Sequence, residues 1–269
     1  MVSDRILREI SRNDYLSCAV RYFWDKRASQ ANDQNNRGVK DQGFRSEATG
    51  GKHMDQFFFL IRDLLLDLGV PEGDICTQRR SLDLPGYFRA EKQWDLIVIK
   101  HHPDGKKELV AVLELKSQKG PSFGNNINNR TEEVLGSAYD LWTAYREGAF
   151  KTSPSPWLGY MLLLEDCERS RKGVRNNEPH FEVFPEFKDA SYIERYHQTC
   201  LKLVRERVYS EVCYLLAKEE DRMRPRNYAE PDEILSGYRF LRSLCSHLSN
   251  FYRSGVQGVQ ESPRLEPWG

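Results

Sequence analysis

The sequence predicts an α/β fold in which helices cover a mixed sheet, and three observations predict it. Short apolar runs with strand character occupy residues 95–100, 109–116 and 157–164. Apolar residues recur at helical spacing before, between and after these runs. A turn rich in Pro, Asp and Gly at residues 102–105 separates the first two runs. The order helix, strands, helix, strand is typical of a sheet flanked by helices.

Two helices are expected before the sheet. Residues 3–30 carry one apolar stripe, and residues 54–68 carry another that ends at Gly69, a common C-terminal stop. Residues 29–52 between them are polar and rich in glycine, so we expect a long loop there. The first strand of the sheet is expected within residues 75–84.

More helices are expected after the central strands. Residues 130–150 fit a helix, because Asn129 and Glu132 have the spacing of a capping box. The C-terminal part is expected to be helical, with one amphipathic stripe over residues 193–215 and another over residues 234–248. These additional N- and C-terminal helices would surround the sheet.

We expect a single domain over residues 1–253. Its core would lie at about 50–166 and its helical C-terminal part at 190–253. The Gly-, Pro- and Gln-rich residues 254–269 are expected to be a flexible tail.

The composition indicates an ordinary globular protein of the cytoplasm. Forty basic and forty acidic residues give zero net charge, which neither supports nor excludes DNA as a partner. The six cysteines contain no C-x-x-C pair, which argues against a zinc ribbon and favours reduced thiols. The N-terminus has no apolar signal-peptide core, and the longest apolar runs are too short to cross a bilayer.

The central hairpin carries a candidate catalytic site. Asp95 and Glu114 lie almost symmetrically about the turn, so antiparallel pairing would put their Cβ atoms roughly 4.5–5.5 Å apart. Two carboxylates so close favour a divalent cation between them, and hard oxygen ligands suit Mg²⁺. Lys116 shares the face of Glu114 because strand side chains alternate. Leu115 points the other way, but its backbone carbonyl would still reach the metal.

This arrangement offers what phosphodiester hydrolysis needs: a Lewis acid, a positioned water and positive charge near the phosphorus. The simpler interpretation is that Asp95, Glu114 and Lys116 are unrelated charges at two strand ends, because the pattern acid-x-Lys is common by itself. The apolar strand, the Asp on its partner strand and the helix that follows together favour the catalytic reading.

The residues around this hairpin resemble the XhoI family of type II restriction endonucleases. The resemblance is dense over residues 84–100 and 109–150, and it continues at 157–170 and 179–196. It extends from about residue 50 to about residue 216, which is most of the chain.

The resemblance implies a mixed sheet of the PD-(D/E)xK, or restriction endonuclease-like, core. Asp95 and Glu114 would be metal ligands, with Mg²⁺ as the cofactor, and Lys116 the catalytic lysine. The chain departs from the pattern at Trp94, where the name of the fold has proline, but Asp is the chemical part. The implied enzyme is a homodimer that cuts a palindrome, CTCGAG in the best-known members, beside a methyltransferase that protects the host sites.

Candidate DNA-binding residues follow the second strand of the hairpin. The amide and guanidinium groups of this segment suit base edges or phosphates, and its place beside Lys116 favours DNA contact. The simpler reading is an Asn-rich turn before a helix cap. The candidates are Asn125, Asn126, Asn128, Asn129 and Arg130.

A second basic cluster precedes the hairpin, formed by Arg79, Arg80, Arg89 and Lys92. Phosphate contact and ordinary solvated charge are nearly equal readings of these four residues.

Three functions remain open at this point. The leading one is a site-specific restriction enzyme whose dimer interface lies on residues 191–218 and 232–253. A structure-specific or repair nuclease on the same fold is the second, because fold does not determine function. A non-catalytic DNA-binding module is the third, and the presence of all three catalytic residue types argues against it.

Overall fold

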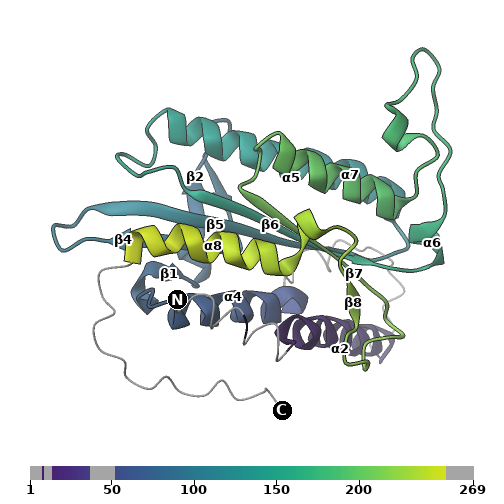
Figure 1. Ribbon diagram of the computed structural model, residues 1–269, viewed down its shortest axis with the longest axis horizontal. Coiled ribbons are helices and arrows are strands. Elements are labelled where there is room, and N and C mark those ends of the chain that lie inside the picture. Colours follow the sequence, from purple (N-terminus) through teal and green to yellow (C-terminus); the bar gives the residue numbers. More distant parts are fainter. Residues whose placement is uncertain (1–7, 9–13, 37–51, 253–269) are drawn as a thin grey trace.

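The computed structural model describes Arg8 and residues 14–36 and 52–252. A mixed six-stranded sheet in the order β1-β4-β5-β6-β7-β8 forms its centre (Figure 1). β5 pairs antiparallel with β4 and parallel with β6, which makes the sheet mixed as predicted. Its strands are β1 (Ile75–Cys76), β4 (Leu96–His101), β5 (Lys107–Gln118), β6 (Trp157–Glu165), β7 (Glu211–Ala217) and β8 (Tyr228–Ala229).

A separate two-stranded ribbon, β2 (Asp83–Pro85) with β3 (Glu91–Gln93), lies outside this sheet. The α-helices are α2 (Tyr15–Asn36), α4 (Asp55–Asp67), α5 (Phe123–Arg146), α6 (Glu168–Arg171), α7 (Tyr192–Arg205) and α8 (Gly237–Tyr252). Short 3-10 helices are η1 (Lys52–Met54), η2 (Glu72–Asp74), η3 (Arg79–Ser81), η4 (Pro185–Phe187) and η5 (Glu233–Leu235).

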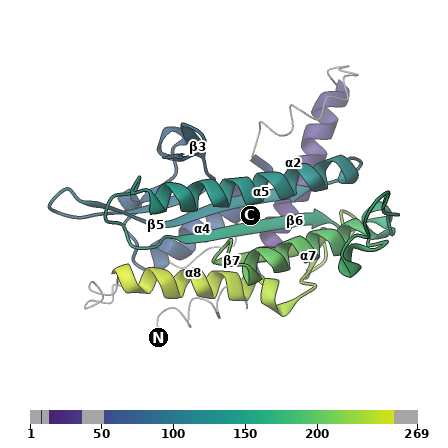
Figure 2. The ribbon, with the colours of Figure 1, turned by 90° about the horizontal axis from the view of Figure 1, so that it is seen from above.

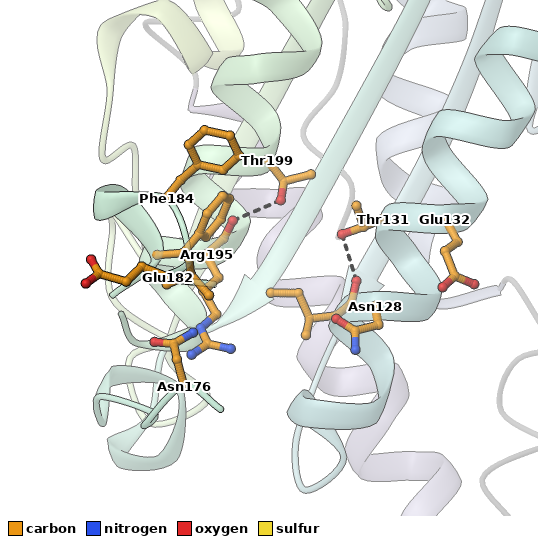
Figure 3. Close-up of a pocket in the computed structure, with 11 residues that line it drawn as sticks. Asn128, Thr131, Glu132, Asn176, Glu182, Phe184, Arg195 and Thr199 are labelled. Atoms are coloured by element: carbon orange, nitrogen blue, oxygen red, sulfur yellow. Dashed lines mark hydrogen bonds between the residues drawn. The ribbon is translucent and has the colours of Figure 1, made fainter. Parts of the chain in front are cut away.

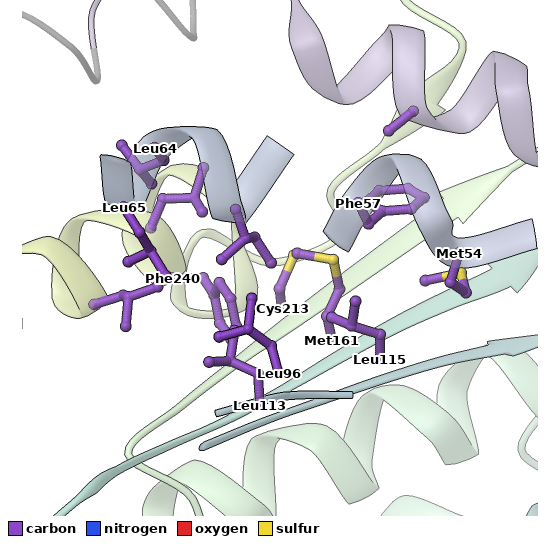
Figure 4. Close-up of a cluster of buried hydrophobic side chains, with 14 of the residues drawn as sticks. Met54, Phe57, Leu64, Leu65, Leu96, Leu113, Leu115, Met161, Cys213 and Phe240 are labelled. Carbon is purple, nitrogen blue, oxygen red and sulfur yellow. The ribbon is translucent and has the colours of Figure 1, made fainter. Parts of the chain in front are cut away.

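Helices cover both faces of the sheet, as Figures 1 and 2 show. One face packs against α2, α4 and α8, where Leu113 and Leu115 of β5 meet buried side chains such as Phe57 and Phe240 (Figure 4). The other face packs against α5 and α7, where Val112 contributes to a second buried cluster. Strand alternation therefore sends Leu113 and Leu115 to the first face and Glu114 to the second.

Several predicted elements are confirmed. Helix α4 covers the predicted residues 54–68 almost completely, and Gly69 follows with a φ of +82°. β4 and β5 form the predicted hairpin, with Gly105 at a φ of +83° in its turn. β6 occupies the predicted residues 157–164. Short-range signals, namely periodicity and turn chemistry, specify these elements.

The predicted strand at residues 75–84 is wrong in extent. Only β1 joins the main sheet, η3 interrupts the run, and β2 leaves to pair with β3. Exposed residues such as Arg79 and Arg80 occupy this interruption, so there is no apolar face to continue the strand.

The predicted helical stripe over residues 193–215 is also wrong in its second half. Helix α7 ends at Arg205, and Arg207 has a φ of +55° that no helix continues. All seven residues of β7 are buried between β6 and its other neighbour, β8. A strand covered on both faces is apolar throughout, so short sequence windows do not distinguish it from a buried helix.

Helix α5 begins earlier than predicted. Its N-cap is Ser122 rather than Asn129, and its first turns contain the asparagines that were expected in a turn. Phe123 and Ile127 are buried against the sheet, and this packing outweighs the weak helix propensity of asparagine.

The predicted loop at residues 29–52 is wrong at its start, because α2 continues to Asn36. Residues 37–51 of that segment and the predicted tail at residues 254–269 lie outside the described residues. Within the part of the chain that the structure describes, no helix is long and apolar enough to cross a membrane.

Candidate active site

The hairpin brings the two predicted carboxylates together at its open end. Leu96 pairs with Leu113, so the next position places Asp95 opposite Glu114. The backbone N–H of Asp95 donates to the Leu113 carbonyl at 3.1 Å, and the Leu115 N–H donates to Asp95 Oδ2 at 2.7 Å. The sequence prediction of a cross-strand pair is confirmed, while the roles of these residues stay predictions.

Glu114 is buried among polar partners. Only 1% of its side chain is exposed, and its Oε1 lies 3.0 Å from Lys116 Nζ and 3.0 Å from Lys92 Nζ. The Tyr209 hydroxyl donates to the other oxygen, Oε2, at 3.4 Å. Two ammonium groups therefore share one carboxylate oxygen, which offsets the desolvation of the charge.

Lys92 reaches this carboxylate from the ribbon. Its side chain is 12% exposed, and its Nζ lies 4.3 Å from the centre of the Trp94 ring. The cation–π contact and the ion pair hold the ammonium in one position.

Helix α5 supplies a further acidic group. Glu133 Oε1 lies 3.4 Å from Lys116 Nζ, and its Oε2 accepts a hydrogen bond from Arg130 at 2.7 Å. Arg130 and Glu133 are neighbours on the helix because they are three residues apart. A chain of alternating charges thus runs from the ribbon through Glu114 and Lys116 to α5.

Burial and charge perturb these groups in opposite directions. Burial raises the pKa of Asp95, and the nearby Lys116 ammonium opposes that shift. Burial by itself would lower the pKa of Lys116, but Glu114 and Asp95 raise it above its usual value. Burial works against the ionisation of Glu133, but Lys116 and Arg130 leave its pKa below the usual range. Lys116 is therefore charged in this environment.

The donor set fits a hard divalent cation. Asp95 and Glu114 provide adjoining carboxylates, and Asp95 Oδ1 accepts no hydrogen bond from the described residues. Among the residues that the structure describes, no group of three His, Cys, Asp or Glu side chains could hold a metal ion. Mg²⁺ suits such a pair of carboxylates, because it commonly takes one or two carboxylates and completes its shell with water and phosphate oxygens.

The five candidate DNA-binding residues occupy different faces of α5. Asn126 and Arg130 are four residues apart on one face, and Arg130 reaches the catalytic network through Glu133. Asn128 lines a cavity of about 550 Å³ between α5 and α7, opposite Asn176 and Arg195 (Figure 3). Asn125 and Asn129 are exposed. The structure thus connects Arg130 to Lys116 of β5 through Glu133, and it places Asn128 in the cavity between α5 and α7.

The sequence does not identify three neighbours of the predicted catalytic trio. Glu133 would have been recognised from its spacing to Arg130 if the helix had been placed correctly. The sequence leaves phosphate contact and solvated charge as nearly equal interpretations of Lys92, and neither places its ammonium at Glu114. No motif or spacing in the sequence predicts the contact of Tyr209 with Glu114, because only the pairing of distant strands brings the two residues together.

The chain is similar to a family of known proteins. A family model described as Restriction endonuclease XhoI matches residues 33–230. The type II restriction enzyme BstVI of Geobacillus stearothermophilus is 51% identical over 210 residues, 78% of this chain and 93% of that protein.

Two further relatives are similar over shorter regions. The type II restriction enzyme XhoI of Xanthomonas vasicola is 47% identical, covering 69% of this chain and 72% of that protein. The type II restriction enzyme AbrI of Azospirillum brasilense is 47% identical, covering 61% and 71%. No solved structure gives a significant match. With a family model that matches most of its length and relatives of this similarity, the chain belongs to the XhoI family of type II restriction endonucleases.

Proposed function

We propose that this restriction endonuclease hydrolyses phosphodiester bonds of double-stranded DNA at the site formed by Asp95, Glu114 and Lys116, with Mg²⁺ as cofactor. The observation that carries the proposal is the junction of β4 and β5. There Asp95 adjoins Glu114, and Lys116 Nζ lies 3.0 Å from Glu114 Oε1. If these residues were only unrelated charges at two strand ends, their side chains would be exposed to solvent, but the Glu114 side chain is buried.

Each residue has a distinct part in the proposed reaction. Asp95, Glu114 and the Leu115 carbonyl would hold Mg²⁺, which when bound supplies Lewis-acid charge at the scissile phosphate. The Lys116 ammonium orients the attacking water and stabilises negative charge that develops on the phosphoryl oxygens. Arg130 lies where it would neutralise a neighbouring phosphate.

The proposed target is CTCGAG, which the resemblance to the family suggests. A palindrome with two strands to cut calls for a two-fold symmetric homodimer, one subunit for each strand. The expected interface on residues 191–218 and 232–253 has to use exposed side chains, because β7 and the apolar stripe of α8 are buried.

Three further proposals concern the cellular and structural setting. A cognate methyltransferase would protect the host's own sites as a genetic partner. The enzyme would act in the cytoplasm, where incoming DNA meets it. Residues 1–253 would form one domain, and limited proteolysis should then release only terminal fragments.

Digestion of one sequenced plasmid tests the proposed activity. Discrete fragments ending at CTCGAG are expected with Mg²⁺ and none with EDTA. Glu114→Ala and Lys116→Ala should each lower the rate by at least about a thousandfold, because several kcal/mol of transition-state stabilisation are lost. Both variants should keep the far-ultraviolet circular dichroism of the wild type.

The same digest separates the alternatives. Full activity in either variant would disprove the assigned site. Cleavage at branched or damaged DNA without a shared sequence would favour the structure-specific nuclease. Binding of DNA without cleavage under any metal would favour the non-catalytic module.

A further inference from the structure

The β2–β3 ribbon is separate from the main sheet and ends in a short tip. Asp83 pairs with Gln93 and Pro85 with Glu91, so the tip comprises residues 86–90. The ribbon belongs to no part of the main sheet, and Figure 2 shows it as a projection beside α5.

A buried carboxylate on α5 anchors this tip. Asp140 Oδ1 accepts hydrogen bonds from the backbone N–H groups of Tyr87 at 2.8 Å and Phe88 at 2.7 Å. Its Oδ2 accepts another from Arg89 Nε at 2.8 Å, and the side chain of Asp140 is only 4% exposed. A Cβ on Gly86 would overlap Asp140 Oδ2, so glycine is required for this approach. Charge-assisted bonds of this kind hold the tip rigid.

The anchored tip exposes two aromatic rings to solvent. Tyr87 is 54% exposed and Phe88 65% exposed, and Phe88 stacks on the 60% exposed Tyr139 with ring centres 5.7 Å apart. Contiguous exposed apolar surface of this kind marks an interaction site more often than chance. Because the rings are already fixed, binding loses little conformational entropy.

Basic residues accompany the rings. Residues 78–93 contain four cationic side chains. Arg89 pairs with the buried Asp140 and Lys92 with the buried Glu114, which leaves Arg79 and Arg80 for an outside partner. Arg79 and Arg80 are exposed on η3, and Gln93 of β3 donates a hydrogen bond to the Arg79 carbonyl at 3.0 Å. This bond joins η3 to the ribbon. Cations interleaved with aromatic rings are the pattern of a nucleic-acid surface.

The ribbon is continuous with the proposed catalytic site. Lys92 lies in β3, a few residues from the tip, and bonds directly to the buried Glu114. Any duplex whose phosphate lies at the carboxylate pair must therefore pass close to this ribbon.

We propose that the β2–β3 ribbon with η3 is a DNA-binding wing that contacts the duplex beside the scissile phosphate. Arg79 and Arg80 neutralise phosphates, while Tyr87 and Phe88 pack against sugars or base edges. The proposal rests on the proposed function, because it takes duplex DNA as the substrate at Glu114. The exposed Arg79 and Arg80 and the continuity with the proposed catalytic site favour DNA over a second copy of the chain.

Binding can be measured separately from cleavage. A fluorescent duplex carrying CTCGAG, with Ca²⁺ in place of Mg²⁺, reports affinity by anisotropy. The double variant Tyr87→Ala/Phe88→Ala should bind roughly tenfold more weakly, as expected for lost aromatic contacts. Arg79→Ala/Arg80→Ala should also flatten the salt dependence of binding, by roughly one phosphate contact for each arginine.

Matched controls lie outside the ribbon, the proposed catalytic site and the expected dimer interface. Phe59→Ala in α4 removes an exposed aromatic ring and Lys107→Ala, near the turn of the β4–β5 hairpin, an exposed cation, and both should bind the duplex like the wild type. Thermal unfolding of every variant checks that the fold is retained.

Three other outcomes would overturn the proposal. If the ribbon variants bind like the wild type while the wild type cuts, only the wing is disproved. If the aromatic variant converts a dimer into a monomer by light scattering, the surface serves a second copy instead. If the wild type neither binds nor cuts any duplex, the proposed function fails as well.

Discussion

Replacement of Lys92 by methionine tests how the buried carboxylate is neutralised. Glu114 is almost fully buried, and two ammonium groups lie 3.0 Å from the same oxygen. Lys92→Met keeps the length and apolar stem of the side chain but removes one of these charges. Lys116 then remains as the nearest cation, with the Tyr209 hydroxyl at 3.4 Å from the other oxygen.

The expected loss follows from the geometry. At 3.0 Å the gross attraction between unit charges is about 5 kcal/mol for an effective dielectric constant near 20. Desolvation of the two groups offsets a large part of this energy, and removal of one partner from a buried pair generally costs about 3–5 kcal/mol. Because Lys116 still neutralises the oxygen, we expect the free energy of unfolding to fall by about 2 kcal/mol.

Urea unfolding with EDTA present measures this loss. Lys106→Met is the matched control, because Lys106 lies 2.8 Å from Glu108 but is 41% exposed. Its removal should lower the free energy of unfolding by less than about 1 kcal/mol. Ca²⁺ should then stabilise Lys92→Met more than the wild type, since a cation bound at Glu114 would replace the lost charge.

A loss below about 0.5 kcal/mol for Lys92→Met would refute the reasoning, because surface substitutions typically have effects of that size. Equal stabilisation of variant and wild type by Ca²⁺ would show that Lys92 does not compete with a cation for Glu114.

Three further predictions concern other parts of the molecule. Burial lowers the pKa of His53 from 6.5 to about 4, so stability should fall as the pH decreases through this window, in which only the unfolded chain gains a proton. Urea titrations at several pH values should give a shallower pH dependence for His53→Gln, and an unchanged dependence would contradict the prediction. Gly159→Ala should lower the free energy of unfolding by about 1–3 kcal/mol, because its Cβ would overlap the Trp157 ring; a melting temperature equal to the wild type would argue against this packing. Arg130→Ala or Asn126→Ala should reduce discrimination for CTCGAG by about 1–3 kcal/mol in a digest of a randomised-site library, whereas a uniform loss across all sequences would indicate phosphate contact alone.

Local signals in the sequence determined the elements that form the β4–β5 hairpin. The turn at residues 102–105 and the alternation of β5 are enough to place Asp95 opposite Glu114 and to send Lys116 to the same face. Helix α4 and its Gly69 stop are equally local. Such features are predictable because the residues that specify them are neighbours along the chain.

Tertiary structure decided what surrounds that hairpin. Burial of Phe123, not a capping motif, sets the start of α5, and burial on both faces makes β7 a strand. The contacts of Glu114 with Lys92 and Tyr209, and those of Asp140 with the ribbon tip, join residues far apart in sequence. These contacts form only after the sheet has assembled, so no periodicity or spacing along the chain predicts them.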